Sequence, residues 1–348
     1  MVQHEIFMHR CLELAELGKG FVSPNPMVGA VIVHNGLIIG EGYHHKYGEA
    51  HAEVNAVNQV IAKFNNSVEL LKESTIYVSL EPCAHYGKTP PCSDLIIKHR
   101  IPKVVVGCRD PFDQVNGKGI EKLEAAGIEV ITGVLEEECK WLNRRFFTRI
   151  QKHRPYIILK WAQTIDGFFA PENGSQHWIT GTESRKLVHQ WRSEEDAVLV
   201  GKNTAMIDNP QLNVRNANGK SPKRVVIDRK LELSKNLNLF DQSVETFVFN
   251  EITTDVDGKI KYIALEDFER YVPQYILFQL YLQDIQSVII EGGAFTLNKF
   301  IEAGLWDEAR IFTGENNLNK GIVAPQISGN TSVEFSVGSD KFRIFYNS

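Results

Sequence analysis

Four residues in the N-terminal part of the chain have the types and spacing of a catalytic zinc site. His51 and Glu53 belong to the triplet His-Ala-Glu, Cys83 directly follows Pro82, and Cys92 comes nine positions later. One imidazole and two thiolates hold zinc by three bonds and leave a fourth position for water, whereas structural zinc sites are usually closed by four protein ligands. Zinc lowers the pKa of its water toward about 7, and a nearby carboxylate can transfer protons. We therefore expect His51, Cys83 and Cys92 to bind zinc and Glu53 to act as the catalytic acid/base in hydrolytic loss of ammonia.

The elements expected around these residues bring them to one edge of a sheet. Residues 75–80 read as a buried strand that delivers Cys83 at its carboxyl end, and helices are expected to begin at His51 and at Cys92. A helix N-terminus stabilises thiolate and other negative charge. Open α/β sheets place their sites at the carboxyl ends of strands, so the four residues are expected to converge there.

The remaining pattern predicts two α/β domains. Asn35-Gly36 joins two apolar runs in the manner of a hairpin, and strands alternate with helices on both sides of a basic segment, Arg149–Arg154, which we interpret as a linker. We expect a single helix over 136–150 and another from Thr182, with Thr182 as its N-cap. A chain of 348 residues suits two domains, placed here at 1–146 and 147–348.

Composition excludes several classes of function. The chain is 43% hydrophobic and 23% charged with a net charge of −5, so it offers no basic field for nucleic acid. It contains no apolar run of about 18 residues and no signal-peptide pattern at Met1, which favours a cytoplasmic protein without a membrane segment. Three further cysteines, Cys11, Cys108 and Cys139, lie in apolar or helical contexts and are interpreted as buried thiols.

The N-terminal motifs resemble one branch of the zinc nucleobase deaminases. The general signature has two residues between its cysteines, but eight separate Cys83 from Cys92 here, and His85 within that insert is a rival ligand that we assign to a substrate or structural role. With this insert, the chain is similar to the pyrimidine deaminase domain of the bifunctional riboflavin-biosynthesis deaminase/reductases. The motifs that carry the resemblance are Ser23–Gly29, His51–Glu53, Glu81–Cys92 and Asp110–Gly119.

The second half resembles the reductase domain of the same family. The matching motifs are Lys160–Gly167, Trp178–Gly181, Asp208–Arg215 and Glu291–Gly293. From the residues alone the signal is weaker. Gly292-Gly293 between a strand and a helix suits a phosphate cradle but is as often a plain turn, and isolated arginines such as Arg192 and Arg215 are commonly surface ion pairs. No G-x-G-x-x-G occurs, so a Rossmann cofactor site is not supported.

The resemblance implies a fold, two reactions and a set of contacts. It implies an N-terminal cytidine-deaminase-like three-layer sandwich and a C-terminal dihydrofolate-reductase-like domain. The first would deaminate 2,5-diamino-6-(5-phosphoribosylamino)pyrimidin-4-one with zinc, and the second would reduce the ribosyl group to ribityl with NADPH. The implied cofactor contacts are Ala162, Trp178, Thr204, Asp208, Gly293, Ala294, Phe295 and Thr296. The implied substrate contacts are Asn25, His44, Lys88, Thr89, Gln176, Arg192, Leu212, Arg215 and Glu291. A homo-oligomer is also expected.

Three departures and two alternatives stay open. Gln176 stands where the family usually has serine, Arg229 stands where a small polar residue is expected near the cofactor, and residues 315–326 lack the usual hydrophobic-glycine pattern. One alternative is a zinc deaminase of another base, nucleoside or RNA adenosine; the net charge argues against RNA as the substrate. The other is a non-catalytic C-terminal scaffold domain. Lys202 or Arg229 is a candidate for recognising a ribose phosphate.

Overall fold

The chain folds into two compact units, Met1–His153 and Arg154–Ser348. The computed structural model describes residues 2–86, 90–112, 115–173, 175, 177–328 and 331–347. The boundary expected after residue 146 falls inside helix α7 (Arg144–Lys152), which belongs to the first unit. Where the two activities divide along the chain stays a prediction. None of the helices in the described ranges is long and apolar enough to cross a bilayer.

The first unit is a three-layer sandwich around a five-stranded sheet. Strand order is β2-β1-β3-β4-β5, in which β1 is antiparallel to β2 and β3, while β3, β4 and β5 run parallel. Both faces of β1 are buried, with Ala30 and Ile32 on one and Val31 and Val33 on the other, so its continuous apolar run suits a central strand. The strands are β1 (Gly29–His34), β2 (Leu37–Tyr43), β3 (Thr75–Leu80), β4 (Lys103–Cys108) and β5 (Glu129–Thr132).

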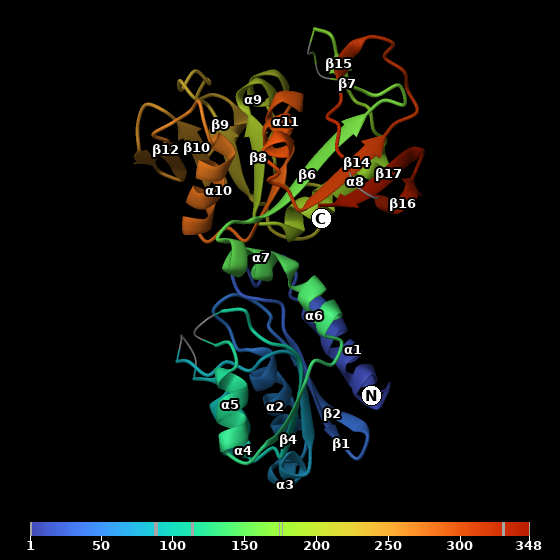
Figure 1. The fold of residues 1–348 in the computed structure, drawn as a ribbon, viewed down its shortest axis with the longest axis vertical. Helices are drawn as coiled ribbons and strands as arrows, with labels where there is room; N and C mark the ends of the chain where they lie inside the picture. Colours follow the sequence, from blue (N-terminus) through green and yellow to red (C-terminus); the bar gives the residue numbers. More distant parts are fainter. Residues whose placement is uncertain are drawn as a thin grey trace. The chain divides into compact units, whose positions relative to one another are not determined.

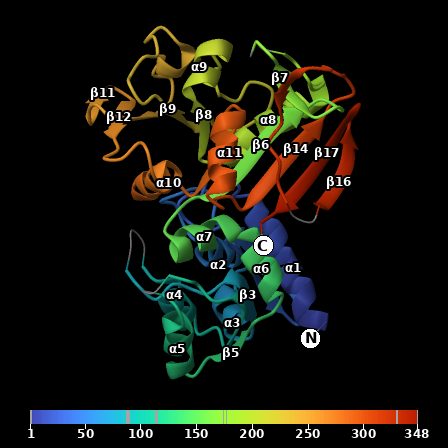
Figure 2. The ribbon, with the colours of Figure 1, turned by 45° about the horizontal axis from the view of Figure 1, so that its top comes forward.

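Helices cover both faces of this sheet. One core lies between the sheet and the group that includes α2 and α4, and the opposite core lies against α1, α6 and α7. Figures 1 and 2 show α1 and α6 together, away from α4 and α5. The helices are α1 (Val2–Glu16), α2 (Ala52–Lys63), α3 (Ser67–Lys72), α4 (Cys92–His99), α5 (Lys118–Ala125), α6 (Glu136–Leu142) and α7.

Two expectations about the end of this unit are wrong. The single helix expected over 136–150 is divided at Asn143, because the buried Asn143 amide bonds to both the N–H and the carbonyl of Met27, each at 2.8 Å. The expected linker Arg149–Arg154 is helical as far as Lys152, since the buried face of α7 with Phe146 and Thr148 packs into the unit. Helix α3 was not expected.

The second unit is built on a ten-stranded sheet. Its order is β11-β12-β10-β9-β8-β13-β6-β14-β17-β16, and the run from β12 to β14 is parallel, whereas β11, β17 and β16 are antiparallel to their neighbours. A separate pair joins β7 and β15. The strands are β6 (Tyr156–Gln163), β7 (Phe168–Pro171), β8 (Ala197–Gly201), β9 (Lys223–Ile227), β10 (Thr246–Asn250), β11 (Asp255–Asp257), β12 (Ile260–Ala264), β13 (Ser287–Ile290), β14 (Glu308–Thr313), β15 (Gly321–Val323), β16 (Thr331–Val337) and β17 (Asp340–Tyr346).

Helices again cover both faces. Helices α10 (Val272–Leu282) and α11 (Ala294–Glu302) pack over one core, on the near side of the sheet in Figure 2. Helices α8 (Thr182–Glu194) and α9 (Lys202–Asp208) contribute to the other, together with the short 3₁₀ turn Asn238–Phe240. Helix α9 was not expected.

The expected N-cap of α8 is wrong. Gly181 occupies that position, and the Asp340 carboxylate accepts hydrogen bonds from the Gly181 N–H at 2.8 Å and the Ser184 hydroxyl at 2.6 Å. The cap therefore comes from β17, far away in sequence, and leaves no local signal near Thr182.

Candidate functional site

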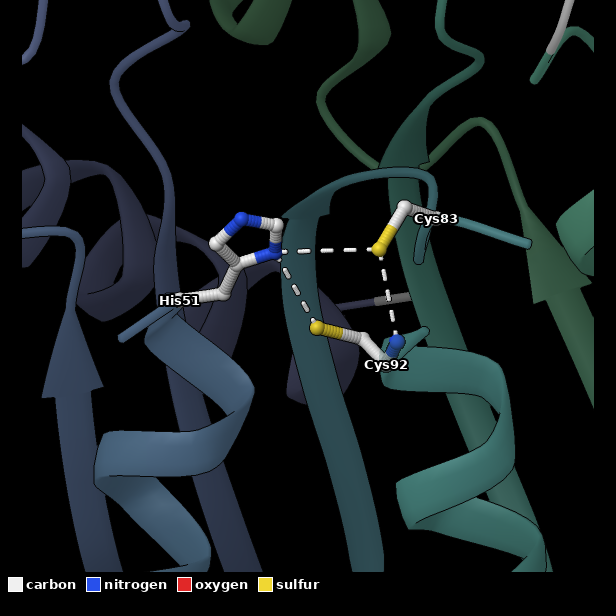
Figure 3. Close-up of side chains that lie close together, drawn as sticks. All are labelled: His51, Cys83 and Cys92. Carbon is white, nitrogen blue, oxygen red and sulfur yellow. Dashed lines mark hydrogen bonds between the residues drawn. The ribbon is translucent and has the colours of Figure 1, made fainter. Parts of the chain in front are cut away.

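The residues predicted to bind zinc come together at the carboxyl edge of the first sheet. His51 is the N-cap of α2, Cys92 is the first residue of α4, and Cys83 follows β3. The His51 Nδ1 atom lies 3.3 Å from the Cys92 sulfur and 3.7 Å from the Cys83 sulfur (Figure 3). The three donor atoms all lie within 4.8 Å of one another.

This donor set fits a zinc ion. Bonds of about 2.3 Å to sulfur and about 2.1 Å to nitrogen in a tetrahedral site place nitrogen and sulfur about 3.6 Å apart, close to the observed separations. Hydrogen bonds from the Cys92 thiol and from His51 lower the pKa of Cys83 to about 4, so one thiolate is already favoured. The Cys92 backbone N–H also reaches the Cys83 sulfur at 3.3 Å, as expected for a thiolate at a helix N-terminus.

Glu53 lies beside this cluster with a buried carboxyl group. It sits in the first turn of α2 and is 3% exposed. Burial raises its pKa, while His51 opposes that rise and the neighbouring Cys83 adds to it. A carboxyl group with a raised pKa near a reacting centre can both give and take a proton near neutral pH.

Asn25 and His44, two predicted substrate contacts, also lie next to each other here. The His44 ring donates from Nδ1 to the Ala50 carbonyl at 3.0 Å, because a carbonyl can only accept. Its Nε2 is then an acceptor for the Asn25 amide at 3.2 Å, and burial lowers the His44 pKa, which favours this neutral form. The His44 and His51 ring centroids are 5.5 Å apart, so both predicted contacts border the zinc-binding cluster.

A buried carboxylate that we did not predict as functional holds the neighbouring loop. Glu81, 4% exposed, accepts hydrogen bonds from the backbone N–H groups of Gly117 and Gly119, each at 3.0 Å, and more distantly from Asp110 and Ile120. Glu81 stands two residues before Cys83, so the same residue supports the loop and lies next to a predicted metal ligand. Only the position of Glu81 inside a family motif hinted at this.

The described residues include only part of the insert between the cysteines. His85 is exposed and does not belong to the metal-ligating group found among the described residues. Lys88 and Thr89, both predicted substrate contacts, lie outside the described residues.

In the second unit the predicted residues line one large cavity. Its volume is about 1830 Å³, above the roughly 300–1,000 Å³ of a typical small-ligand pocket, and so has room for a dinucleotide and a substrate together. Every predicted cofactor contact borders it: Ala162, Trp178, Thr204, Asp208, Gly293, Ala294, Phe295 and Thr296. So do four predicted substrate contacts: Arg192, Leu212, Arg215 and Glu291. Gln176 lies outside the described residues.

A largely buried ion pair lies in the lining of this cavity. The Arg192 guanidinium donates to both carboxylate oxygens of Glu291 at 2.8 Å, and the Lys160 ammonium lies 3.8 Å from the same carboxylate. Burial would raise the Glu291 pKa, but Arg192 and Lys160 lower it to about 2. Burial lowers the Lys160 pKa. Lys160 was recognised only as part of a motif, because a strand residue gives no local sign that its side chain will meet α8 and the end of β13.

One wall of the cavity carries arginine and histidine side chains that could contact a phosphate. His189 and Arg192 lie one turn apart on α8 and both reach the Asn213 carbonyl, at 3.0 and 3.5 Å. The pKa of His189 is lowered by burial and by the charges of Arg192 and Arg215, which places Arg215 within electrostatic range. Arginine is well suited to phosphate because its donors are planar and paired.

The Gly293 turn has the geometry of a phosphate cradle. Gly293 is the N-cap of α11, and a Cβ atom there would lie 3.2 Å from the Thr204 hydroxyl. A Cβ on Gly201, at the start of α9, would lie 2.4 Å from the Thr296 hydroxyl. The glycines therefore let the two helix N-termini approach each other, and helix N-termini favour anionic groups.

The described departures from the family pattern have structural partners. Arg229 lines the cavity and donates to Glu251 and Glu269. Lys202, which is not a departure but the other candidate for recognising a ribose phosphate, also lines the cavity and pairs with Glu232. In the 315–326 segment, Asp166 accepts hydrogen bonds from the Leu318 and Asn319 N–H groups, and β15 pairs with β7. These partners show how each departure is accommodated in the fold.

Both halves match family models. A model described as the cytidine and deoxycytidylate deaminase zinc-binding region matches residues 1–108. A second, described as the RibD C-terminal domain, matches residues 155–315. The first match contains His51, Glu53, Cys83 and Cys92, and the second contains all the predicted reductase contacts.

Curated proteins match nearly the whole chain. The riboflavin biosynthesis protein RibD of Aquifex aeolicus is 41% identical over 345 residues, which is 97% of this chain and 94% of that protein. RibD of Escherichia coli is 34% identical over 327 residues, 89% of this chain and 87% of that protein.

Solved structures agree over the same length. The diaminohydroxyphosphoribosylaminopyrimidine deaminase/5-amino-6-(5-phosphoribosylamino)uracil reductase of Thermotoga maritima superposes with a TM-score of 0.90 at 38% identity, covering 100% of this chain and 99% of that one. Acinetobacter baumannii RibD gives a TM-score of 0.89 at 33% identity, with the same coverage.

Proposed function

The chain belongs to the RibD family of bifunctional riboflavin-biosynthesis deaminase/reductases, and on that premise we propose how its own residues divide the two reactions. Residues 1–146 carry the zinc-dependent deaminase and residues 147–348 carry the NADPH-dependent reductase. The observation that carries the proposal is the cluster of His51, Cys83 and Cys92 donor atoms beside the buried Glu53. The match of the second half to the RibD C-terminal domain speaks against a merely non-catalytic scaffold there.

In the deaminase unit, the substrate is the diaminopyrimidinone ribosyl phosphate. His51 Nδ1 and the two cysteine sulfurs would hold zinc, which would supply a water of lowered pKa. The Glu53 carboxylate accepts the proton of the attacking water and returns it to the departing nitrogen, so that ammonia leaves and a carbonyl remains. Asn25 and His44 bind the ring edge, and their mutual hydrogen bond fixes the orientation of both side chains. Lys88 and Thr89 are proposed to bind the anionic part of the substrate.

In the reductase unit, NADPH would supply a hydride. The ribosyl ring opens to an imine as the C–O ring bond at the anomeric carbon breaks and the glycosylamine proton passes to the ring oxygen. Hydride then adds to that carbon and the imine nitrogen takes a proton, which leaves a ribityl chain. The Gly293 turn with Ala294, Phe295 and Thr296, together with Thr204, Asp208, Ala162 and Trp178, is proposed to bind the cofactor. Arg192, Leu212, Arg215, Glu291 and Gln176 are proposed to bind the substrate. The protein's contribution is mainly to orient the two reactants and to place positive charge near the substrate phosphate.

We further propose a cytoplasmic homo-oligomer that acts on this small phosphorylated molecule and does not bind nucleic acid. The net charge of −5 supports the last point.

Substituting Glu53 tests the deaminase assignment. Glu53→Gln keeps the shape of the side chain but removes its proton-transfer ability, so ammonia release should fall by roughly 10²-fold or more. Zinc content, measured by atomic absorption, should stay at one ion per chain. Glu49→Gln, the same change on an exposed loop residue, is the control and should retain full activity. Loss of zinc in Glu53→Gln would show that Glu53 is a ligand and that the proposed role is wrong.

A further inference from the structure

The loop between α9 and β9 has a backbone that cannot hold its shape by local preference. It follows Asp208, the last residue of α9, and carries Leu212 and Arg215 into the cavity wall. Asn209 and Leu212 have φ values of 40° and 49°, in the left-handed region. Asparagine tolerates this region, but leucine rarely adopts it, so contacts from outside the loop must impose the conformation.

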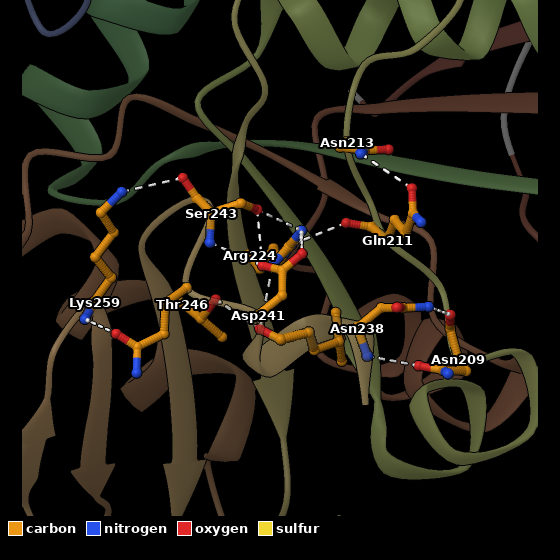
Figure 4. A network of polar contacts seen from close by, with 11 residues as sticks. Asn209, Gln211, Asn213, Arg224, Asn238, Asp241, Ser243, Thr246 and Lys259 are labelled. Carbon is orange, nitrogen blue, oxygen red and sulfur yellow. Dashed lines mark hydrogen bonds and ion pairs between the residues drawn. The ribbon is translucent and has the colours of Figure 1, made fainter. Parts of the chain in front are cut away.

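A fully buried arginine supplies such contacts. Arg224 on β9 is 0% exposed, and its Nε donates to the Gln211 carbonyl at 2.9 Å, immediately before Leu212 in the chain. On the other side, the guanidinium donates to both oxygens of Asp241, at 2.5 and 3.3 Å. Figure 4 shows Arg224 between Gln211 and Asp241.

The chemistry of the site requires arginine. A guanidinium has five N–H donors, and five acceptors surround this one: the two Asp241 oxygens, the Gln211 and Leu239 carbonyls at 2.9 and 3.4 Å, and the Ser243 hydroxyl at 3.1 Å. The bonds from Arg224 lower the Asp241 pKa to about 2, so the pair stays charged at neutral pH. Lysine, with three donors on one atom, cannot serve both sides.

A second pair of bonds anchors the loop to the same support. The Asn209 side-chain oxygen accepts from the Asn238 N–H, and the Asn209 carbonyl accepts from the Asn238 amide, both at 2.7 Å. Asn238 begins the 3₁₀ turn that leads to Asp241. The backbone is therefore restrained by hydrogen bonds at both left-handed residues. Those to Asn238 act on Asn209 itself, and that from Arg224 acts on the carbonyl that precedes Leu212.

The Gln211 side chain connects the anchored loop backbone to residues that line the cavity. Its oxygen accepts from the Arg215 guanidinium at 2.9 Å and from the Asn213 amide at 3.2 Å. The Asn213 carbonyl in turn accepts from His189 and Arg192. Gln211 thus links the buried Arg224, through its backbone, to the exposed Arg215, through its side chain.

The geometry points to Arg224 as a positioning residue that fixes the 208–215 loop and so aims Arg215 at the substrate phosphate. This inference rests on the proposed function, in which Arg215 contacts the substrate. Arg224 lies in the interior and touches neither reactant, so its effect is on binding rather than on the hydride step.

The test compares Arg224→Gln with Thr246→Val in the full-length, zinc-loaded protein. Thr246 is fully buried and its hydroxyl donates to the same Leu239 carbonyl, so its loss weakens this region without touching the loop. For the deaminated phosphoribosyl substrate, Arg224→Gln should raise KM roughly tenfold while kcat stays within about threefold, the signature of lost ground-state binding. Thr246→Val should leave KM unchanged, and ammonia release by the other unit should be normal in both variants.

Two further variants make the result decisive. Arg215→Gln should raise KM to a similar extent, and adding Arg224→Gln to it should raise KM little further, because both remove the same contact. Arg224→Lys should recover only part of the affinity. With the dephosphorylated substrate, neither Arg215→Gln nor Arg224→Gln should change KM.

The failures are distinguishable. If Arg215→Gln raises KM while Arg224→Gln behaves like Thr246→Val, Arg224 is structural only and the inference falls, while the proposed function stands. If Arg215→Gln leaves KM unchanged during normal NADPH oxidation, the substrate assignment of Arg215 is wrong, and the inference falls with it.

Discussion

Gly119 packs so closely on Pro82 that a Cβ atom at Gly119 would lie 2.0 Å from the Pro82 carbonyl oxygen. Pro82 directly precedes Cys83, one of the proposed zinc ligands, and Gly119 also donates its N–H to Glu81. The first turn of α5 and the segment after β3 that carries Cys83 are therefore in close backbone contact.

Substituting Gly119 should impair the deaminase alone. In Gly119→Ala the added methyl group meets the Pro82 carbonyl oxygen, a backbone atom that cannot rotate away. Either the start of α5 or the Cys83 turn must therefore shift. We expect kcat/KM for ammonia release to fall by roughly tenfold or more. Reductase activity of the same preparation, assayed with the deaminated substrate, is the internal control. Unchanged deamination would mean that the start of α5 shifts without disturbing Cys83.

Removing zinc should expose one reactive thiol. The pKa of Cys83 is lowered to about 4 by hydrogen bonds from Cys92 and His51, and Cys83 is half-buried, whereas the other four cysteines are buried. A disulfide reagent at mildly acidic pH should label one thiol quickly in the zinc-free protein, since the thiolate is the nucleophile. Added zinc should suppress this fast phase and Cys83→Ser should abolish it. A fast phase that survives in Cys83→Ser would assign the reactive thiol to another cysteine.

The Arg192–Glu291 pair should stabilise the second unit in a pH-dependent way. The folded-state pKa of Glu291, about 2, lies below its ordinary value of 4.5, so the contribution is present above about pH 4.5 and is lost as pH falls toward 2. The shift corresponds to about 3 kcal/mol. The free energy of unfolding of Glu291→Gln should be lower than that of the parent by roughly this amount at pH 7. The two values should converge in acid.

Tryptophan fluorescence during denaturant unfolding can measure this difference, because Trp161, Trp191 and Trp306 are buried in the second unit. Glu302→Gln, which breaks an exposed pair with Lys299, is the control and should cost at most about 1 kcal/mol. A Glu291→Gln deficit that persists unchanged at low pH would contradict the ion-pair explanation.

The Gly293 turn should tolerate no side chain without loss of cofactor affinity. Gly293→Ala places a methyl group 3.2 Å from the Thr204 hydroxyl, between two predicted cofactor contacts, and should raise KM for NADPH several-fold. Gly181→Ala is a matched control, because Gly181 is also a helix N-cap with extended backbone but its Cβ would meet nothing nearer than 3.7 Å. Equal KM values in the two variants would argue against a cofactor at Gly293.

The zinc cluster could be predicted from the sequence. The residues that hold both sites in place could not. The His51, Cys83 and Cys92 cluster follows from ligand chemistry and from local elements, since β3 lies where the apolar run predicted it and α2 and α4 begin at the predicted positions. The Glu81 clamp, the Asp340 cap of α8 and the five bonds of Arg224 each join segments distant in the chain. Such long-range contacts leave no periodic pattern in the sequence. A buried arginine also cannot be told from a surface arginine by sequence alone.

The errors have the same origin. The break at Asn143 depends on Met27, which lies more than a hundred residues earlier, and the helical end of the expected linker depends on packing of Phe146. The contacts to the reductase ligands rested on the family resemblance, because Gly-Gly turns and single arginines are ambiguous alone. Only the folded structure shows that these residues line one cavity.

The most direct test of the bifunctional account is a single-vessel turnover. Purified zinc-loaded chain is given the diamino substrate and NADPH, and ammonia and nicotinamide absorbance are followed together. We predict ammonia release followed by NADPH oxidation in equal amount, with no oxidation in Glu53→Gln until the deaminated intermediate is supplied. Deamination without any NADPH oxidation, even with that intermediate supplied directly, would contradict the account.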